Sequence, residues 1–284
     1  MVTLLKQPDI STFALLCGLM VAQMAVMATV ESLSLGTLAK IALFGAPISQ
    51  ALYMVSLEFA NNLCFGNEIL DRCSAIMANF CTGVPYAELV RYFTSEHFAF
   101  HNSKIYKDPE DPSELELTHV NGAGMKLLYL GMYPLFYVHR LLFRHTITFT
   151  RYLFWNVVLQ LIVNTCILYW CGGWALFYVL ASTYAGMSPA HPCAFHFITS
   201  HRPCTSAVDV NLQTRTYSYY GIMNAFTLNA GYHRERHLFR NVPWSRLPLI
   251  RQLYFFNDLP TAYYDSVLQA IHDFVFNPGV TLHT

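Results

Sequence analysis

Two histidines four residues apart, His233 and His237, have the type and spacing that most directly indicate chemistry in this chain. On a helix this spacing places both imidazoles on one face. Neutral imidazole is a good ligand for iron, zinc or copper. A second group lies upstream, where His191, His196 and His201 follow one another at intervals of five residues. One such pair alone is more often structural, but two groups beside apolar segments favour a redox metal held where a membrane meets the cytosol.

The composition indicates a membrane protein. Of the 284 residues 54% are hydrophobic and 12% are charged, whereas soluble domains carry about 25% charged residues. Aromatic residues reach 15%, as a lipid-facing surface with interfacial rings requires. The net charge is zero, which argues against nucleic acid as a partner. The eight cysteines form no C-x-x-C pair, so we interpret them as small apolar residues in a reducing compartment.

Four segments are apolar and long enough, or nearly so, to cross a bilayer core of about 30 Å, namely 11–30, 33–56, 152–170 and 174–190. Lys40 lies inside the second segment, where its charge must reach the headgroups, and Pro47 predicts a kink. Residues 127–138 are apolar but too short to span, so they predict a helix lying in the interface.

Lys and Arg gather in the segments between and after these spans. The turns 31–32 and 171–173 carry neither residue, so the positive-inside rule places 57–151 and 191–284 in the cytosol. We therefore predict an all-α integral membrane protein with a single domain over 1–284, about four transmembrane helices and a cytosolic helical cap. Both histidine groups then face the cytosol.

Several longer motifs carry a resemblance to a known family. They include Phe65–Asn67, Gly83–Tyr86, His191-Pro192, His196 to His201, Tyr217–Asn224, Thr227–His233, Arg240–Pro243, Leu247–Leu249 and Tyr263–Tyr264. Over residues 5 to 276 the chain resembles the sphingolipid Δ4-desaturases, or dihydroceramide desaturases, of the membrane fatty-acid-desaturase superfamily. That family's additional N-terminal segment is expected to be absent here.

The resemblance implies a fold, a cofactor and a reaction. Members are four-span proteins of the endoplasmic reticulum membrane, with a cytosolic cap that holds a di-iron centre. They take electrons from cytochrome b5 and use O2 to introduce a trans double bond into dihydroceramide, giving ceramide. Iron carries the removal of hydrogen from an unactivated C–H bond, because side chains alone cannot perform that step.

The three histidine boxes that hold the family's iron are degraded in this chain. The first, H-E-x-x-H, reads Leu57-Glu58-Phe59-Ala60-Asn61, so it keeps the glutamate and loses both ligands. The second, H-x-x-H-H, reads Thr94-Ser95-Glu96-His97-Phe98 and keeps one histidine of three.

The third box, also H-x-x-H-H, reads His233-Arg234-Glu235-Arg236-His237 and keeps two of three histidines. Arg236 is the least suitable replacement, because guanidinium is permanently charged and offers no lone pair. Five of eight box histidines are therefore missing, at positions 57, 61, 94, 98 and 236.

The metal-ligand candidates that remain are His97, His196, His201, His233 and His237. Glu58, Glu96, Glu235 and Asn229 are candidates for supporting residues around them. Three imidazoles with an open position, at His196, His233 and His237, would suit one Fe(II) or zinc ion.

Each of these residues also has a structural interpretation. His97 is then a packing histidine, and Glu58 marks the wet face of its helix. His233 and His237 are satisfied by Glu235 or an aspartate, and His191 caps a span or bonds the backbone.

Three functions follow from these alternatives. The first is a desaturase-like enzyme of sphingolipid metabolism, active through a reorganised site. The second is a catalytically impaired homologue, a pseudoenzyme that binds ceramide-like lipid or a partner such as cytochrome b5 or an intact desaturase. The third is a single-metal hydroxylase or hydrolase. Ligand count favours the second, because a fold persists after its site is lost.

Overall fold

The computed structural model describes residues 5–92, 94, 122–143, 149–199, 218–253 and 263–276, with only the backbone described for 136–143. The longer helices are α2 (Ser11–Met27), α4 (Ala46–Ala60), α5 (Glu68–Asn79), α7 (Ala123–Phe143), α8 (Arg151–Cys171), α9 (Gly173–Met187), α13 (Leu247–Leu253) and α14 (Val267–Phe276). The shorter elements are α3 (Leu35–Lys40), α10 (His196–Thr199), α12 (His233–Leu238), β1 (Ser218–Tyr219), β2 (Tyr263–Tyr264) and three 3-10 turns (Pro192–Ala194, Ile222–Ala225, Trp244–Arg246).

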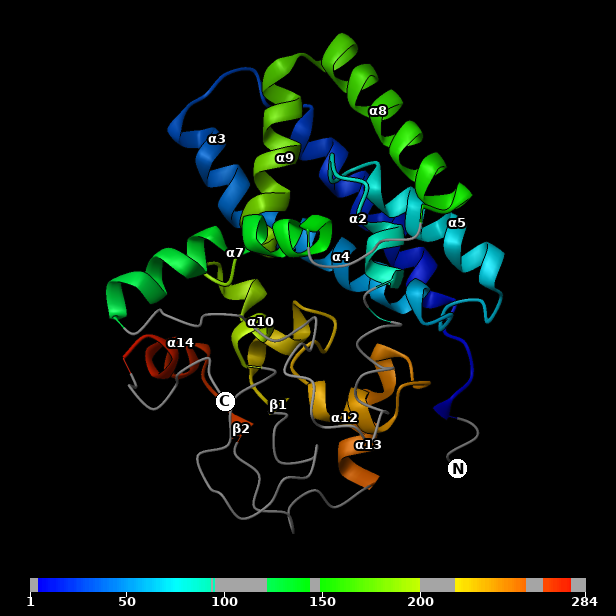
Figure 1. The fold of residues 1–284 in the computed structure, drawn as a ribbon, viewed down its shortest axis with the longest axis vertical. Coiled ribbons are helices and arrows are strands. Elements are labelled where there is room, and N and C mark those ends of the chain that lie inside the picture. The colour runs from blue at the N-terminus through cyan, green and yellow to red at the C-terminus, as the bar shows by residue number, and fades with distance from the viewer. Residues whose placement is uncertain are drawn as a thin grey trace.

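The upper half of the molecule is a helical bundle (Figure 1). Helix α4 lies at its centre and packs against α2, α5 and α9, while α8 packs against α9. The predicted spans thus correspond to α2, to the continuous helix formed by α3, a π-helical turn and α4, and to α8 and α9. All four predicted segments are helical.

Within the described ranges, two helices are long and apolar enough to cross a membrane, Leu35–Ala60 and Arg151–Cys171. Helices α2 and α9 are shorter, with 17 and 15 residues. Helix α8 is inverted relative to a helix of a water-soluble core, because its buried residues are the polar Asn156 and Gln160. Most of its exposed side chains are large and apolar, a distribution that suits lipid as the surrounding solvent.

Aromatic side chains lie at both ends of α8. Phe149, Phe154 and Trp155 are exposed near its start, and Tyr169 and Trp170 are exposed near its end. With 21 residues, the helix is about 32 Å long at 1.5 Å per residue, which matches a bilayer core of about 30 Å. Rings at both ends of such a helix correspond to the two interfaces of a bilayer.

The structure resolves both irregular features predicted for the second span. Lys40 Nζ donates to the carbonyl of Thr29, 2.8 Å away, so its charge lies at the C-terminal end of α2, where the helix dipole favours a cation. A π-helical turn, Ile41–Gly45, precedes Pro47. Such a turn accommodates a proline, which supplies no N–H to the preceding turn.

Close contact between α4 and α9 depends on Gly186. A Cβ there would lie 2.5 Å from the carbonyl oxygen of Ala46 on α4, so the two backbones would have to separate.

We expect Gly186→Ala to destabilise the protein by about 1–3 kcal/mol, measured as a lower thermal midpoint in mild detergent. The matched control is Gly18→Ala within α2, where a Cβ meets nothing within 4 Å and helix propensity improves by up to about 1 kcal/mol. Equal midpoints for the two variants would contradict this account of the contact.

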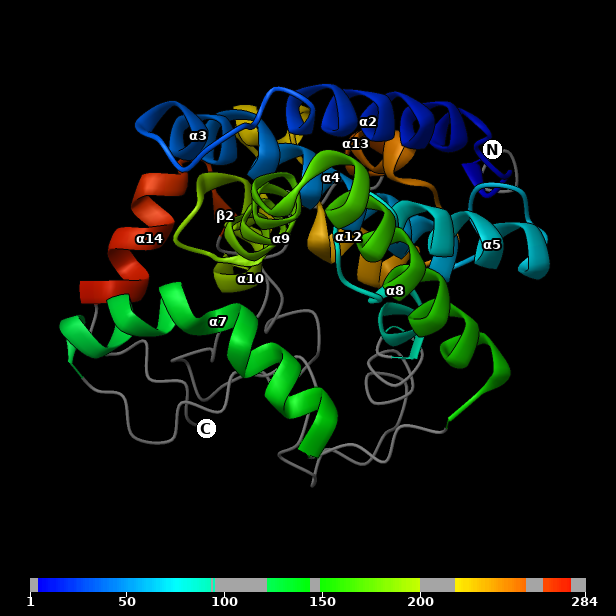
Figure 2. The same cartoon turned by 90° about the horizontal axis from the view of Figure 1, so that it is seen from above.

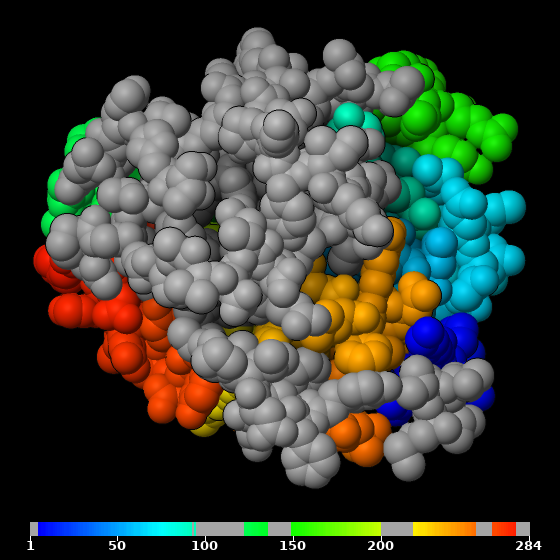
Figure 3. Space-filling model, turned by 60° about the horizontal axis from the view of Figure 1, so that its bottom comes forward, coloured from blue at the N-terminus to red at the C-terminus, as the bar shows by residue number. Residues whose placement is uncertain are grey.

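The lower half carries the C-terminal elements. β1 and β2 pair in parallel, with Ser218 opposite Tyr263 and Tyr219 opposite Tyr264. The segment around α12 and α13 lies against the N-terminal residues, beside α5 (Figure 3). Ser245 donates to Asp9, and Arg246 Nη1 donates to the carbonyls of Leu5 and Gln7 at 3.2 and 2.6 Å. These contacts hold the C-terminal segment beneath the end of α4.

Candidate functional site at the end of helix α4

Glu58, in the last turn of α4, is the centre of the site. Its side chain is 1% exposed and forms an ion pair with Nη2 of Arg236 from α12. Its second oxygen accepts a hydrogen bond from the backbone N–H of Trp244 at 3.0 Å. The interpretation that Glu58 marks a wet helix face is therefore wrong, because the folded C-terminal segment covers it.

Asn61, the other end of the degraded first box, is also occupied. Its amide nitrogen donates to the Leu57 carbonyl at 2.8 Å. Its amide oxygen accepts from Nε of Arg240 at 3.3 Å. Leu57 has no atom that can ligate a metal, so neither lost histidine of this box has a functional replacement.

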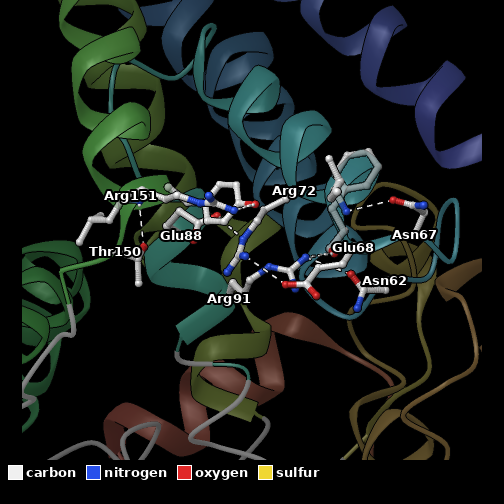
Figure 4. A network of polar contacts seen from close by, with 12 residues as sticks. Asn62, Asn67, Glu68, Arg72, Glu88, Arg91, Thr150 and Arg151 are labelled. Atoms are coloured by element: carbon white, nitrogen blue, oxygen red, sulfur yellow. Dashed lines mark hydrogen bonds and ion pairs between the residues drawn. The ribbon is translucent and has the colours of Figure 1, made fainter.

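A third arginine reaches the same turn from residues 87–92, a helical segment of the chain. Arg91 Nη2 donates to the Phe59 carbonyl and to Asn62 Oδ1, both at 3.0 Å. Figure 4 shows Arg91 beside Arg72, which pairs with Glu68 and Glu88, each at 3.0 Å. Burial lowers the pKa of Arg91, although an arginine remains charged at physiological pH.

Three guanidinium groups therefore surround the last turn of α4, from Arg91, Arg236 and Arg240. Cations are stable at a helix C-terminus because its carbonyls carry partial negative charge. An iron ion at this turn would face these fixed cations, and like charges repel strongly where water is excluded. The described residues at this end of α4 thus do not fit the family's iron.

On α12, His233 and His237 meet as their spacing predicted. Their Nε2 atoms lie 2.9 Å apart and the ring centroids 4.4 Å apart. One imidazole must donate and the other accept, so the pair needs one Nε2–H between them. Two nitrogens bound to one tetrahedral zinc at about 2.1 Å would be roughly 3.4 Å apart. The two imidazoles therefore lie at hydrogen-bond distance, closer together than in a two-imidazole zinc chelate.

The carboxylate of Glu235 bonds to groups other than His233 and His237, so the interpretation that it satisfies these histidines is wrong. It is fully buried and accepts hydrogen bonds from Ser218 Oγ at 2.8 Å and from Tyr220 OH at 2.6 Å. The guanidinium of Arg251 stacks on the Tyr220 ring, 3.4 Å from its centroid. Glu235 consequently fixes α12 to the strand segment on the side away from His233 and His237.

His196 faces α4 instead of α12. Its Nε2 lies 3.5 Å from the side-chain nitrogen of Gln50, and its ring lies 4.1 Å from that of Phe197. Burial lowers the pKa of His196 to about 3, so the imidazole is neutral. Among the described residues, no three His, Cys, Asp or Glu side chains are grouped suitably for a metal. The structure therefore does not bring His196 together with His233 and His237.

The remaining predicted residues divide into described and undescribed ones. Asn229, in the left-handed region at φ 57°, donates to the Trp244 carbonyl at 3.0 Å and so positions the residue whose N–H reaches Glu58. Thr94 is buried and donates to the Val90 carbonyl at 2.7 Å. Glu96, His97, Phe98 and His201 lie outside the described residues.

His191 bonds the backbone, as one of its two structural interpretations predicted. Its Nδ1 accepts from the backbone N–H of Cys193 at 3.3 Å, and its Nε2 lies 2.9 Å from the Ala42 carbonyl in the π-helical turn. His191 therefore caps the turn after α9 and ties that turn to the second predicted span.

Comparison with known proteins identifies the family of this chain. The sequence model described as Fatty acid desaturase matches residues 64–265. The chain belongs to the fatty acid desaturase family. The matched range begins after Leu57–Asn61, so the degraded first box lies outside it.

Curated relatives in this family are sphingolipid delta(4)-desaturases. The Candida albicans protein is 34% identical over 249 residues, which is 82% of this chain and 66% of the relative. The proteins of Mus musculus and Homo sapiens are 32% and 31% identical, over 84% of this chain and 72% of each relative. The chain thus spans about two thirds of the length of the curated relatives it matches. This desaturase family is iron-dependent, and its members are membrane proteins.

Sequence reasoning missed three contributors to the site, the side chains of Arg91 and Arg240 and the N–H of Trp244. Arg240 stands three residues after His237, a spacing that puts it close to the helix end but gives no partner. No local pattern pairs it with Asn61, 179 residues away.

Proposed function

We propose that this chain is a sphingolipid-desaturase homologue that holds a ceramide-like lipid in the membrane without desaturating it. The observation that carries the proposal is the ion pair between Glu58 and Arg236. It joins box 1 to box 3 where the family's iron ligands are expected. An internal cation here replaces the need for a bound metal to neutralise Glu58.

The lipid part of the proposal rests on the family and on the surface of the bundle. The relatives are named for action on sphingolipids, and in this chain α2, α5 and α9 pack around α4. The exposed apolar side chains of α8 suit a membrane environment. A dihydroceramide or ceramide molecule combines an apolar chain with an amide and hydroxyl groups, which suits a site at the membrane surface.

The proposal also covers the cellular membrane in which the protein lies and its orientation there. We place the protein in the endoplasmic reticulum membrane with four spans and with both termini in the cytosol. The turns at the far end of the bundle, 28–34 and 171–173, carry no Lys or Arg of their own, although the Lys40 side chain reaches the first of them. The arginines around α4 lie at its opposite end, as the positive-inside rule requires of a cytosolic face.

A second function is favoured by one observation, the meeting of the His233 and His237 rings on one face of α12. With the two nitrogens separated by about 0.5 Å more, this pair could hold one Fe or Zn ion with ligands from elsewhere, which would support hydroxylation or hydrolysis.

Partners in the first function are an intact desaturase or cytochrome b5, to be sought by affinity capture from membranes in mild detergent.

The deciding experiment measures metal, binding and turnover on one preparation. Protein purified in mild detergent and supplied with Fe(II) is analysed for iron and zinc per chain. It is then given dihydroceramide, O2, cytochrome b5 and its reductase. We expect saturable dihydroceramide binding, less than one metal ion per chain and no ceramide above a no-protein control.

Other results would overturn the proposal in distinct ways. About two irons with ceramide formation would establish an active desaturase. One metal ion, lost in a His233→Ala/His237→Ala variant, would establish the single-metal alternative. Absence of dihydroceramide binding in a folded preparation would remove the lipid-binding function.

A further inference from the structure

Helix α7 has an inverted distribution of polar and apolar side chains. Its buried stripe contains Lys126, which is 2% exposed, together with Tyr129, Leu130 and Tyr133. Its opposite stripe consists of large apolar side chains that are 36% to 57% exposed, namely Met125, Leu127, Leu128, Met132 and Leu135. In water a helix buries its apolar stripe and exposes its charge, so the outer face of α7 is not built for water.

Pro134 explains how α7 is attached to the bundle. A proline inside a helix has no N–H, so the carbonyl four residues earlier, that of Leu130, loses its helical partner. Ser188 Oγ, just after the end of α9, donates to this carbonyl at 2.7 Å. Tyr184 OH donates to the neighbouring carbonyl of Gly131 at 2.8 Å. The proline-containing turn of α7 is therefore fixed to the C-terminal end of α9.

The inner stripe of α7 is covered from below. Helix α14 packs against α7, with Phe274 6.5 Å from Tyr129 between ring centroids and Lys126 Nζ 6.0 Å from the Phe274 ring. In two perpendicular views α7 extends sideways from the bundle, and α14 lies beside α7 (Figures 1 and 2). Its outer stripe is thus the part of α7 left without a protein partner among the described residues.

We propose that α7 is an interfacial membrane helix whose Met125–Leu135 outer stripe lies in the lipid surface. Its attachment at the end of α9 puts it at the level where a predicted span leaves the bilayer. Five residues, 144–148, separate it from Phe149 and α8. Phe149, Phe154 and Trp155 expose aromatic rings there, so the outer stripe continues an apolar and aromatic surface already suited to the interface.

A lipid surface fits the stripe better than a second copy of this chain. Its exposed side chains are all Met and Leu, with no charged or aromatic residue that would fix a protein partner, whereas protein interfaces are enriched in aromatic and Arg anchors. The inference concerns how the protein sits in the membrane. It holds or fails independently of lipid turnover.

The test uses a photoreactive residue at chosen sites of the full chain. Benzoylphenylalanine replaces Leu128 or Leu135 on the outer stripe, Tyr133 on the inner stripe, or Asn241, an exposed polar position beyond α12. Each variant is reconstituted into phosphatidylcholine vesicles that contain alkyne-tagged phosphatidylcholine, and is then irradiated. Lipid adducts are measured per mole of protein.

We expect the two outer positions to give several-fold more lipid adduct than Tyr133 and Asn241. The outer positions are exposed, so their substitution leaves the core intact, and the Tyr133 variant can be omitted if it fails to fold. Lipid adduct at 128 and 135 no greater than at 241 would overturn the proposal. A dominant adduct between two copies of the chain at these positions would also overturn it, because the occupant would then be protein.

Discussion

Replacing Arg236 by alanine is expected to cost about 3–5 kcal/mol of stability, because it leaves the buried carboxylate of Glu58 without its counter-charge. The effect is large since Glu58 is 1% exposed and its carboxylate has one further partner among the described residues, the Trp244 N–H. The measurement is thermal or denaturant unfolding of the purified protein in mild detergent. The same variant should loosen α12 from α4, so limited proteolysis near residue 240 should accelerate.

A double-mutant cycle separates the ion pair from simple packing. The cycle compares Glu58→Gln, Arg236→Gln and the double variant; the double variant removes both charges, so it should recover much of the loss seen with Arg236→Gln alone. Arg151→Ala is the surface control, because the Arg151 side chain is exposed and, within the described part of the chain, contacts only Tyr152. This variant should change stability by less than about 0.5 kcal/mol. If Arg236→Ala proved as harmless as Arg151→Ala, the ion pair would not stabilise the fold.

Restoring histidine at all five degraded box positions is expected to convert a chain with little iron into one that retains it. The variant carries Leu57→His, Asn61→His, Thr94→His, Phe98→His and Arg236→His. It supplies the missing imidazoles and removes the guanidinium that holds Glu58. Iron per chain after loading with Fe(II) is the readout, and the expected change is from well under one ion to more than one.

The informative control omits a single change. A variant with the other four substitutions that keeps Arg236 should retain much less iron, because its cation still pairs with Glu58 and repels the metal. Equal iron in the four- and five-substitution variants would show that Arg236 is no obstacle. No gain in the five-substitution variant, if it remains folded, would mean that the pocket itself has lost its shape.

Much of the bundle could be predicted from local pattern. The four apolar segments are helices in the structure, with ends within a few residues of those expected, because apolar length and turn residues act locally. The number of membrane spans is harder to predict from local pattern. Two helices are long and apolar enough by themselves, whereas α2 and α9 depend on their neighbours, as Gly186 shows by its contact with Ala46.

The site could be predicted only as a set of residues. The 233/237 spacing predicted two imidazoles on one helical face, and the structure confirms that they meet. The box pattern located Arg236 as the substitution least compatible with iron. Pattern could not predict that Glu58 is buried, since a single glutamate near a helix end is equally consistent with a wet face.

What the sequence determined by itself is therefore composition, helix placement, family resemblance and the loss of five box histidines. Only the tertiary structure decided which side chains contact one another around the degraded boxes. Arg236 meets Glu58 across 178 residues and Arg240 meets Asn61 across 179, and His196 turns to Gln50 across 146. Such pairings follow from how segments distant in the chain pack and exclude water, which local periodicity does not encode.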